Sequence, residues 1–446
     1  MSGDPYLGYE IAVAAIALYG LLLYGLHRGG YLGPDRTLSL FGPALMIKTK
    51  RGLAAIDRWG RFRRFWTRVA DLGVALAALA MASILILLVV DAVLALRLSA
   101  SEAPQIQEAL GIPGINPIIP IGYGIVALVI GVVLHELSHG IVARSQGIGV
   151  KTIGVLVCVV PVGAFVEQND TDMMAAPRRK RDRVAAAGVL ANFVLFAVFF
   201  VALSAVVSSS VVPNATGVGI LYVEPGTPAA NATIAPGDII TAINGTATPT
   251  VAVFEDALAN TTPGETIEVG YYATSSGSVV TTPITLAPSP TIAGRGFLGV
   301  SVSFLTPAEL QQTLANPFGS SSGPYVGAID WIVLPLATLQ PVQGTTATFY
   351  HITGPLGAAG SGTFWIGANL LYWLAWMNLL LGLSNALPLV PLDGGLLFRD
   401  FAASIVARFK RGLSAARLDE IGARAAVVSS FLVLVLLAWQ FVVPRL

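Results

Sequence analysis

Residues 131–140 read Gly131-Val132-Val133-Leu134-His135-Glu136-Leu137-Ser138-His139-Gly140, and the rest of the chain is organised around this stretch. Its histidines follow an apolar run, residues 118–134, that has the character of a membrane-spanning helix. On a helix His135 and His139 are about one turn apart, so both imidazoles leave the same face. That is the spacing of two ligands to one zinc ion, with Glu136 beside the open coordination position as a general base. Ionisable groups are costly inside an apolar helix, so their presence there indicates a functional site.

The composition is that of an integral membrane protein. The chain is 54% hydrophobic and 11% charged, against about 25% charged residues in soluble domains, and its mean hydropathy is +0.73. No basic patch makes a case for nucleic acid as a partner. The single cysteine, Cys158, excludes an intramolecular disulfide and a multi-cysteine zinc site. Residues 1–10 lack the positive region of a signal peptide, so the first apolar run is expected to be retained.

Several apolar runs reach the roughly 20 residues that a bilayer requires. Six spans are predicted, at residues 9–26, 69–96, 118–142, 184–212, 365–389 and 425–443. Basic segments connect them on one side only, at 28–68, 177–183 and 399–424. The first of these segments holds ten Lys and Arg against two Asp, and such a bias places it in the cytoplasm. We therefore expect a multi-pass protein of the cell membrane, a polytopic α-helical fold in contact with the lipid bilayer.

Two apolar stretches do not have the form of a span. Residues 150–166 are rich in valine and bounded by glycine and proline, which predicts a membrane-associated β-hairpin. An unpaired strand edge at membrane depth is tolerated only where it lines a cavity or is covered by protein. Residues 328–339 are too few to cross, so they are predicted to be interfacial or re-entrant.

Residues 213 to about 327 change character. They are rich in Thr, Gly, Pro and Ser, with seven Asp and Glu against one Arg. This predicts a soluble domain, which the predicted topology places on the extracytoplasmic side. The strings Gly219–Ala230 and Ile234–Gly245 resemble a PDZ domain over about 80 residues, an α+β fold, and residues 251–258 would be its helix. The resemblance implies an extended peptide, such as a substrate tail, bound at an edge strand.

A catalytic zinc site needs a third protein ligand beside its water. The two remaining histidines, His27 and His351, fall in the basic loop and on the outer face, so neither matches the depth of the first pair. Asp393 does match, because it lies in a segment broken by Pro and Gly at the inner end of a span. An acidic group there is expected to have a partner.

The predicted chemistry is metal-assisted peptide hydrolysis. One Zn²⁺ would be held by His135, His139 and Asp393, and Glu136 would take a proton from the water and pass it to the leaving amine. Asn192 and Asn385 are candidates for hydrogen bonding to the oxyanion or to the substrate backbone. Hydrogen bonding between helices explains each asparagine equally well.

Three motifs together resemble the core helices of the site-2 protease family of intramembrane zinc metalloproteases. They are His135-Glu136-x-x-His139, Ala187-Gly188-x-x-x-Asn192 and Asn385-x-x-Pro388-x-x-Pro391-Leu392-Asp393-Gly394. The match covers roughly residues 118–400, and it departs mildly at Val189, where the family often has Pro. Gly163 and Phe165 resemble positions of the family's β segment and are candidates for substrate contact. The family's activity implies a single-span membrane protein as substrate, cleaved within its transmembrane helix after another protease has trimmed its outer part. The predicted topology, in which the span at 118–142 runs inward, places the site within the membrane near the cytoplasmic side.

The resemblance divides the chain into six parts. They are accessory helices with a basic loop (1–117), the catalytic core with its hairpin (118–212), the PDZ-like domain (213–300), a linker with the interfacial segment (301–363), the core helix with the Asp-Gly motif (364–400), and a cytoplasmic loop with the last helix (401–446). Two other readings stay open, a catalytically silent PDZ-containing scaffold and a metal transporter. A transporter is disfavoured because no paired broken helices repeat, and only the protease requires Glu136.

Overall fold

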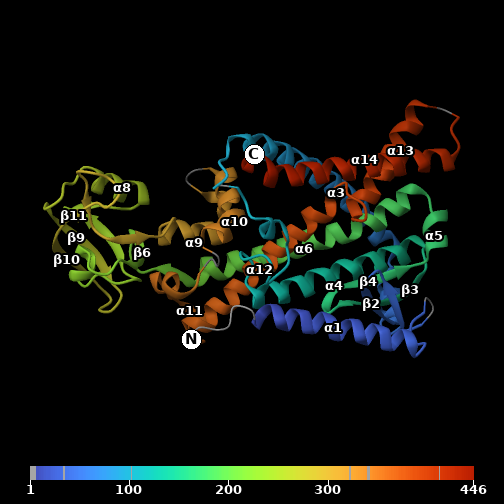
Figure 1. Cartoon of the computed structure of the whole chain (residues 1–446), viewed down its shortest axis with the longest axis horizontal. Coiled ribbons are helices and arrows are strands. Elements are labelled where there is room, and N and C mark those ends of the chain that lie inside the picture. The colour runs from blue at the N-terminus through green and yellow to red at the C-terminus, as the bar shows by residue number, and fades with distance from the viewer. Residues whose placement is uncertain (1–6, 34–35, 102, 321–322, 339–341, 411) are drawn as a thin grey trace. The chain divides into compact units, whose positions relative to one another are not determined.

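The computed structural model describes residues 7–33, 36–101, 103–320, 323–338, 342–410 and 412–446. The chain divides into two compact units. The first comprises residues 1–111, 125–196 and 377–446, and the second comprises residues 112–124 and 197–376. Figure 1 labels the elements of both.

Five helices in the described residues are long and apolar enough to cross a membrane. They contain α3 (Arg63–Leu94), α4 (Ile121–Gln146), α6 (Arg178–Ser210), α12 (Ser361–Ala386) and α14 (Ala415–Val442). Each coincides with a predicted span. The remaining predicted span lies in α1 (Leu7–Arg28), of which residues 13–28 form a shorter apolar helix. The fold is therefore helical, with five candidate membrane-spanning helices among the described residues, while six crossings remain a prediction.

In the first unit, small residues bring α3 and α6 close together. Ala70, Gly73 and Ala77 are buried on one face of α3, and a Cβ at Gly73 would lie 3.2 Å from the Leu190 side chain of α6. Lipid offers little hydrophobic drive for association, so membrane helices rely on such close packing. Helix α13 (Asp393–Phe409) forms a hairpin with α14, and α14 lies beside α3 (Figure 1).

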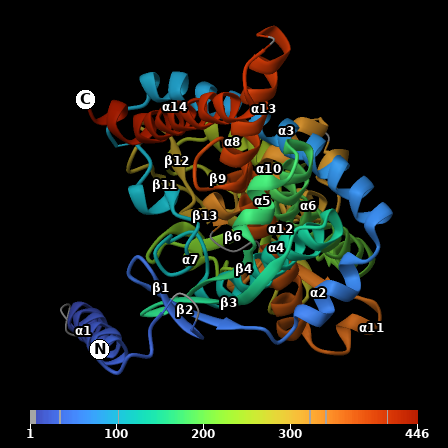
Figure 2. The same cartoon turned by 90° about the vertical axis from the view of Figure 1, so that its right-hand side faces the viewer.

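The predicted hairpin at residues 150–166 is present as β3 (Val150–Cys158) and β4 (Val160–Gln168). It belongs to a larger antiparallel sheet, because β1 (Leu38–Phe41) and β2 (Ala44–Thr49) extend it in the order β1-β2-β3-β4. Figure 2 shows this sheet beside α1. The Tyr19 hydroxyl of α1 bonds to Val157 O at 2.7 Å and accepts from Leu45 N at 3.0 Å. Strand β4 is thus an edge of a four-stranded sheet.

The second unit contains a sheet with the strand order β10-β9-β7-β6-β13, with β8 (Thr246–Ala247) paired to β7. Its strands are β6 (Val218–Val223), β7 (Ile239–Ile243), β9 (Thr266–Ala273), β10 (Ser278–Thr285) and β13 (Val300–Val302). The helix predicted at 251–258 is α8 (Val251–Ala259), whose Phe254 and Leu258 enter the core of this sheet. The segment predicted to be interfacial lies in α10 (Pro324–Thr338), an apolar helix of 15 residues.

Candidate metal centre

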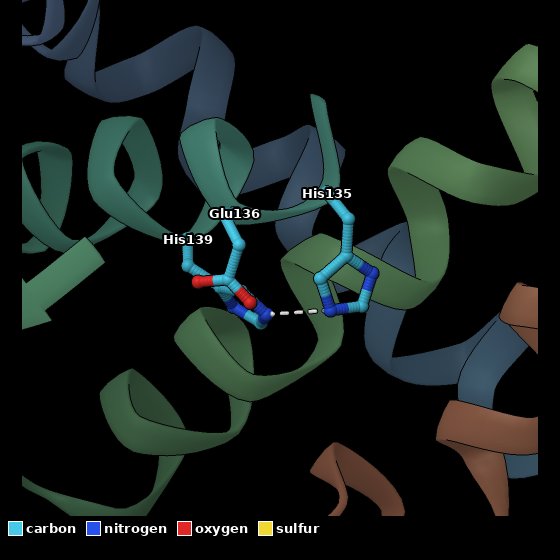
Figure 3. Close-up of side chains that lie close together, drawn as sticks. All are labelled: His135, Glu136 and His139. Atoms are coloured by element: carbon cyan, nitrogen blue, oxygen red, sulfur yellow. Dashed lines mark hydrogen bonds between the residues drawn. The ribbon is translucent and has the colours of Figure 1, made fainter. Parts of the chain in front are cut away.

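Helix α4 places its two histidines together, as their spacing predicts. His135 and His139 are 7% and 6% exposed, and their Nε2 atoms are 3.1 Å apart. Figure 3 shows the two rings and the Glu136 carboxylate converging on one point. The ligand atoms of the three residues all lie within 4.8 Å of one another. The motif therefore forms one cluster with the two nitrogens at its centre.

Asp393 completes this cluster from α13. Its Oδ2 lies 3.2 Å from Nε2 of His135 and 3.2 Å from Nε2 of His139. Tetrahedral ligands at zinc–ligand distances of roughly 2.0–2.1 Å are about 3.3 Å apart, so the three atoms have the spacing of one face of a zinc site. The structure thus brings together the three predicted ligands, and a zinc ion held by them would keep its fourth coordination position open to water.

The hydrogen bond behind His139 fixes which nitrogen faces the cluster. Nδ1 of His139 donates to the backbone carbonyl of Val184 on α6 at 2.7 Å. With its proton on Nδ1, the ring directs a lone pair from Nε2 toward Asp393. No described residue donates a hydrogen bond to Asp393 Oδ2. Two acceptors facing each other at this distance repel unless a cation lies between them, so the donor set fits a metal ion.

Asn192 lies behind His135. Its side-chain amide is 3.1 Å from Nδ1 of His135, and both residues are buried. Turning the amide so that Oδ1 faces the ring lets Nδ1–H donate and gives a partner to this oxygen, which otherwise accepts nothing from the described residues. This contact holds His135 in the tautomer that leaves Nε2 free, as ligand histidines require. The predicted contact of Asn192 with substrate stays a prediction.

Glu136 is held by the sheet. Its Oε2 accepts a hydrogen bond from the backbone N–H of Val166 on β4 at 3.1 Å. Because N–H groups alternate in direction along a strand, the edge of β4 that carries this N–H faces Glu136. The base and the strand edge are therefore neighbours.

Gly188 gives the centre its space. A Cβ at this position on α6 would lie 2.4 Å from Nε2 of His135 and 2.5 Å from Nε2 of His139. Both distances are far below van der Waals contact, so only glycine fits. Glycine has no functional group, and only its place in the motif Ala187-Gly188-x-x-x-Asn192 drew attention to it in the sequence.

The segment before Asp393 is shaped by glycines and braced by α14. A Cβ at Gly394 would meet the carbonyl oxygens of Ala386 and Leu387 at 2.3 Å. Ser429 Oγ donates to Pro388 O at 2.9 Å, and Ser430 Oγ accepts from Val390 N at 2.9 Å. Neither serine was predicted from the sequence, although adjacent hydroxyls within an apolar span were a possible signal.

The remaining predicted residues lie in regular structure. Asn385 Nδ2 donates to Leu381 O at 3.0 Å, a carbonyl of its own helix. On β4, Gly163 lies opposite Leu156 and Phe165 opposite Gly154 of β3. The predicted roles of Asn385, Gly163 and Phe165 toward substrate stay predictions.

A charged contact ties three strands of the sheet together. Lys48 Nζ of β2 lies 3.1 Å from Glu167 Oε2 of β4, and Thr152 Oγ1 of β3 donates to the same oxygen at 2.7 Å. Burial raises the pKa of Glu167, but the bonds from Thr152 and Lys48 and the charge of Lys48 outweigh it, so this pKa is lowered. The carboxylate form of Glu167 is the one that stabilises the sheet.

Comparisons with known proteins agree with this centre. The pattern of peptidase family M50 matches residues 123–433. An uncharacterized protein of Methanocaldococcus jannaschii is 26% identical over 371 residues, which cover 83% of this chain and 80% of that protein. A Clostridium perfringens protein, named as a putative zinc metalloprotease, is 28% identical over 303 residues, 62% of this chain and 85% of that protein.

One solved structure is also similar to part of the chain. The PDZ domain of the SdrC-like protein of Listeria monocytogenes is 25% identical and covers 20% of this chain and 88% of that domain, with a TM-score of 0.18. The match to M50 spans more than half of the chain and includes the histidine pair and Asp393. The family and the cluster together confirm the predicted zinc cofactor. The chain therefore belongs to peptidase family M50, the site-2 protease family that its motifs resemble.

Proposed function

We propose that the protein is an intramembrane zinc metalloprotease that hydrolyses a peptide bond in the transmembrane segment of a single-span substrate. The observation that carries this proposal is the triangle of His135 Nε2, His139 Nε2 and Asp393 Oδ2, with sides of 3.1–3.2 Å. Glu136 lies beside it, and the histidines belong to an apolar helix of 26 residues. Metal-ligand atoms and a carboxylate base at a candidate membrane-spanning helix support hydrolysis at membrane depth.

The chain's own residues account for the proton transfers. Zinc, when bound by the three ligands, lowers the pKa of a water molecule and polarises the scissile carbonyl. Glu136 accepts the proton of that water and delivers it to the leaving nitrogen. The Val166 N–H holds the Glu136 carboxylate in place. Val184 O and Asn192 hold the two imidazoles, so these groups need little rearrangement during the reaction.

A substrate helix must unwind before its peptide bonds can be attacked, because they are hidden in its own hydrogen bonds. The edge of β4 offers new partners to the unwound backbone by strand addition. Since the Val166 N–H on this edge bonds to Glu136, a strand added there passes beside the base. Gly163 and Phe165 lie on the same strand. This arrangement supports a role for β4 in presenting the scissile bond.

The PDZ-like domain has a groove of its own. A cavity of about 180 Å³ is lined by Phe254 and Leu258 of α8 and by residues 295–300, which lead into the edge strand β13. Arg295 Nη2 donates to Glu255 O at 3.3 Å, so its guanidinium lies at α8. An extended peptide beside β13, with its carboxylate at Arg295, fits this groove. We propose a trimmed substrate tail as the occupant.

The orientation follows from charge. Basic residues at 28–68, 177–183 and 399–424 favour the cytoplasmic side. His135 and His139 are past the middle of α4, which ends at Gln146. In this orientation they lie toward the cytoplasmic side, and the PDZ-like domain lies outside the cell. Labelling tests this: a cysteine introduced at Thr246 should react with an impermeant reagent added outside. Labelling only from the cytoplasm would contradict the orientation.

The decisive experiment separates catalysis from metal binding. Full-length wild type and Glu136→Gln are reconstituted with a single-span substrate, and cleavage and zinc content are measured together. We expect the variant to retain about one zinc per chain and to lose cleavage, because the amide cannot accept the proton. Glu420→Gln, which alters a carboxylate that is 42% exposed on α14, is the matched control and should cleave normally. Undiminished cleavage by Glu136→Gln would refute the mechanism.

A further inference from the structure

A buried ion pair joins α6 to α13 away from the metal ligands. Arg181 Nε lies 2.8 Å from Asp400 Oδ2, and Arg181 Nη2 lies 3.0 Å from Asp400 Oδ1. Arg181 is 8% exposed and Asp400 is 2% exposed. The two parallel hydrogen bonds fix the guanidinium and the carboxylate in one plane. A contact of this kind defines both the separation and the rotation of the two helices.

The spacing of this pair relates it to the metal centre. Arg181 precedes Gly188 by seven residues on α6, and Asp400 follows Asp393 by seven residues on α13. Seven residues are about two helical turns, roughly 10.5 Å, and they return to the same face. Gly188 lies against the histidines that Asp393 faces. The two helices are therefore antiparallel, with one contact at the metal and a second two turns away on both.

The packing between these two contacts does not set the register by itself. Ala185 and Val189 of α6 pack with Leu397 of α13 in one apolar cluster. Apolar contacts have no fixed partner atoms, and a shift of about 1.5 Å, the rise of one residue, would change the distances from Asp393 to both imidazoles. A bidentate pair has a single geometry, so it resists that shift.

The pair also connects to the helix that braces the segment before Asp393. Arg178 Nη2 lies 3.0 Å and Arg181 Nη2 3.4 Å from Asp419 Oδ1 on α14. The same helix carries Ser429 and Ser430, which bond to residues 388 and 390. The segment before Asp393 is thus held by the two serines of α14. The helix after Asp393 is held by the Arg181–Asp400 pair.

We propose that Arg181 and Asp400 are positioning residues that hold α13 in the register in which Asp393 binds zinc. The pair makes no contact with the reacting atoms and acts through Asp393. Buried ion pairs add little net stability, since desolvation offsets their attraction, and their contribution here is orientation. The inference rests on the proposed role of Asp393 as the third ligand.

The test compares two bidentate Arg–Asp pairs on α6, one with a buried carboxylate and one whose carboxylate, Asp71, is 36% exposed. Asp400→Asn breaks the α6–α13 pair. The matched control Asp71→Asn breaks the pair of Arg183 with Asp71 on α3, whose two bonds are 2.8 and 2.9 Å. For each purified full-length variant, we would measure the rate of zinc loss to a chelator and the visible spectrum after cobalt substitution. The spectrum reports ligand geometry at the metal, which a general loss of stability does not alter.

We expect Asp400→Asn to lose zinc about tenfold faster than wild type, the effect typical of groups that orient metal ligands, and to show a changed cobalt spectrum. Asp71→Asn should match wild type in both measurements. Wild-type retention and spectrum in Asp400→Asn would overturn the proposal, and so would an equal loss in Asp71→Asn.

Two further variants keep the result interpretable. If Asp400→Asn does not fold, Arg181→Lys keeps the charge but gives up the bidentate contact, and it should lose zinc faster than wild type. Unchanged zinc loss in Arg181→Lys would then overturn the proposal. Asp393→Asn separates the two levels of inference. If it keeps its zinc, the proposed ligand set fails, whereas zinc loss there with full retention in Asp400→Asn refutes only the positioning role.

Discussion

Asp393 Oδ2 lies 3.2 Å from Nε2 of His139, and this contact joins the start of α13 to the middle of α4. The two residues are far apart in the sequence, and neither the histidine pair nor Asp393 alone supplies the three protein ligands of a catalytic zinc site. The contact makes the zinc site depend on the packing of helices as well as on a local motif.

Removing the Asp393 carboxylate should cause loss of the zinc ion. Asp393→Ala leaves two imidazoles, and a catalytic zinc site requires three protein ligands. We expect the purified variant to contain far less than one zinc per chain by elemental analysis. Asp170→Ala, which removes a carboxylate that is 88% exposed, should keep its zinc. Normal zinc content in Asp393→Ala would take this residue out of the ligand set.

Adding one methyl group at Gly188 should have the same effect as losing a ligand. The new Cβ would lie 2.4 Å from His135 Nε2 and displace the imidazoles. Alanine favours a helix over glycine by about 1 kcal/mol, so zinc loss would not reflect a weaker α6. Gly367→Ala on α12, where a Cβ meets nothing within 4 Å, is the control. A Gly188→Ala protein with full zinc and activity would contradict the packing described here.

Loss of the amide behind His135 should weaken metal binding without abolishing it. Asn192→Ala removes the partner of His135 Nδ1, and groups in this position typically change metal affinity by about 10–100-fold. Competition with a chelator of known affinity measures the effect. Asn385→Ala, whose amide bonds to its own helix, should leave zinc affinity unchanged. Equal zinc affinities in both variants would argue against a role for Asn192 at the metal.

The sheet should weaken in acid through Glu167. Its pKa is lowered in the folded protein relative to the ordinary value of 4.5. A lowered carboxyl pKa stabilises the fold above the unfolded value and loses that contribution as the pH falls through the folded value. Hydrogen exchange of β4 amides should therefore be slower in wild type than in Glu167→Gln at neutral pH. The difference should disappear well below pH 4.5, and a difference that persists there would contradict the assignment.

Much of this arrangement could be predicted from the sequence. The pairing of His135 with His139 follows from helical periodicity, and Asp393 follows from its depth in a broken apolar segment. The valine-rich residues 150–166 predicted the hairpin of β3 and β4, and residues 251–258 were predicted to form the helix that is α8. The histidine pair and the hairpin depend on patterns within a few residues of one another, whereas Asp393 had to be matched in depth to the histidines and the helix at 251–258 followed from the PDZ resemblance.

Other features had no local signal. Residues 38–49 lie in a basic segment, and their strands β1 and β2 exist because β3 accepts them as neighbours. Arg181 was visible only as one of several basic residues, since its partner Asp400 is on another helix. Ser429 and Ser430 needed the backbone of residues 388 and 390 before their role could be recognised.

The sequence by itself determined the kind of chemistry, because the geometry of one helix fixes the spacing of His135, Glu136 and His139 wherever that helix lies. Whether these residues form a complete site depends on how the helices and the sheet pack together. The tertiary structure brought Asp393 to the imidazoles, Val166 to Glu136 and the bare Gly188 backbone to the space between the ligands. The physical reason is that backbone geometry sets local periodicity, whereas contacts between helices depend on how side chains far apart in the sequence pack together.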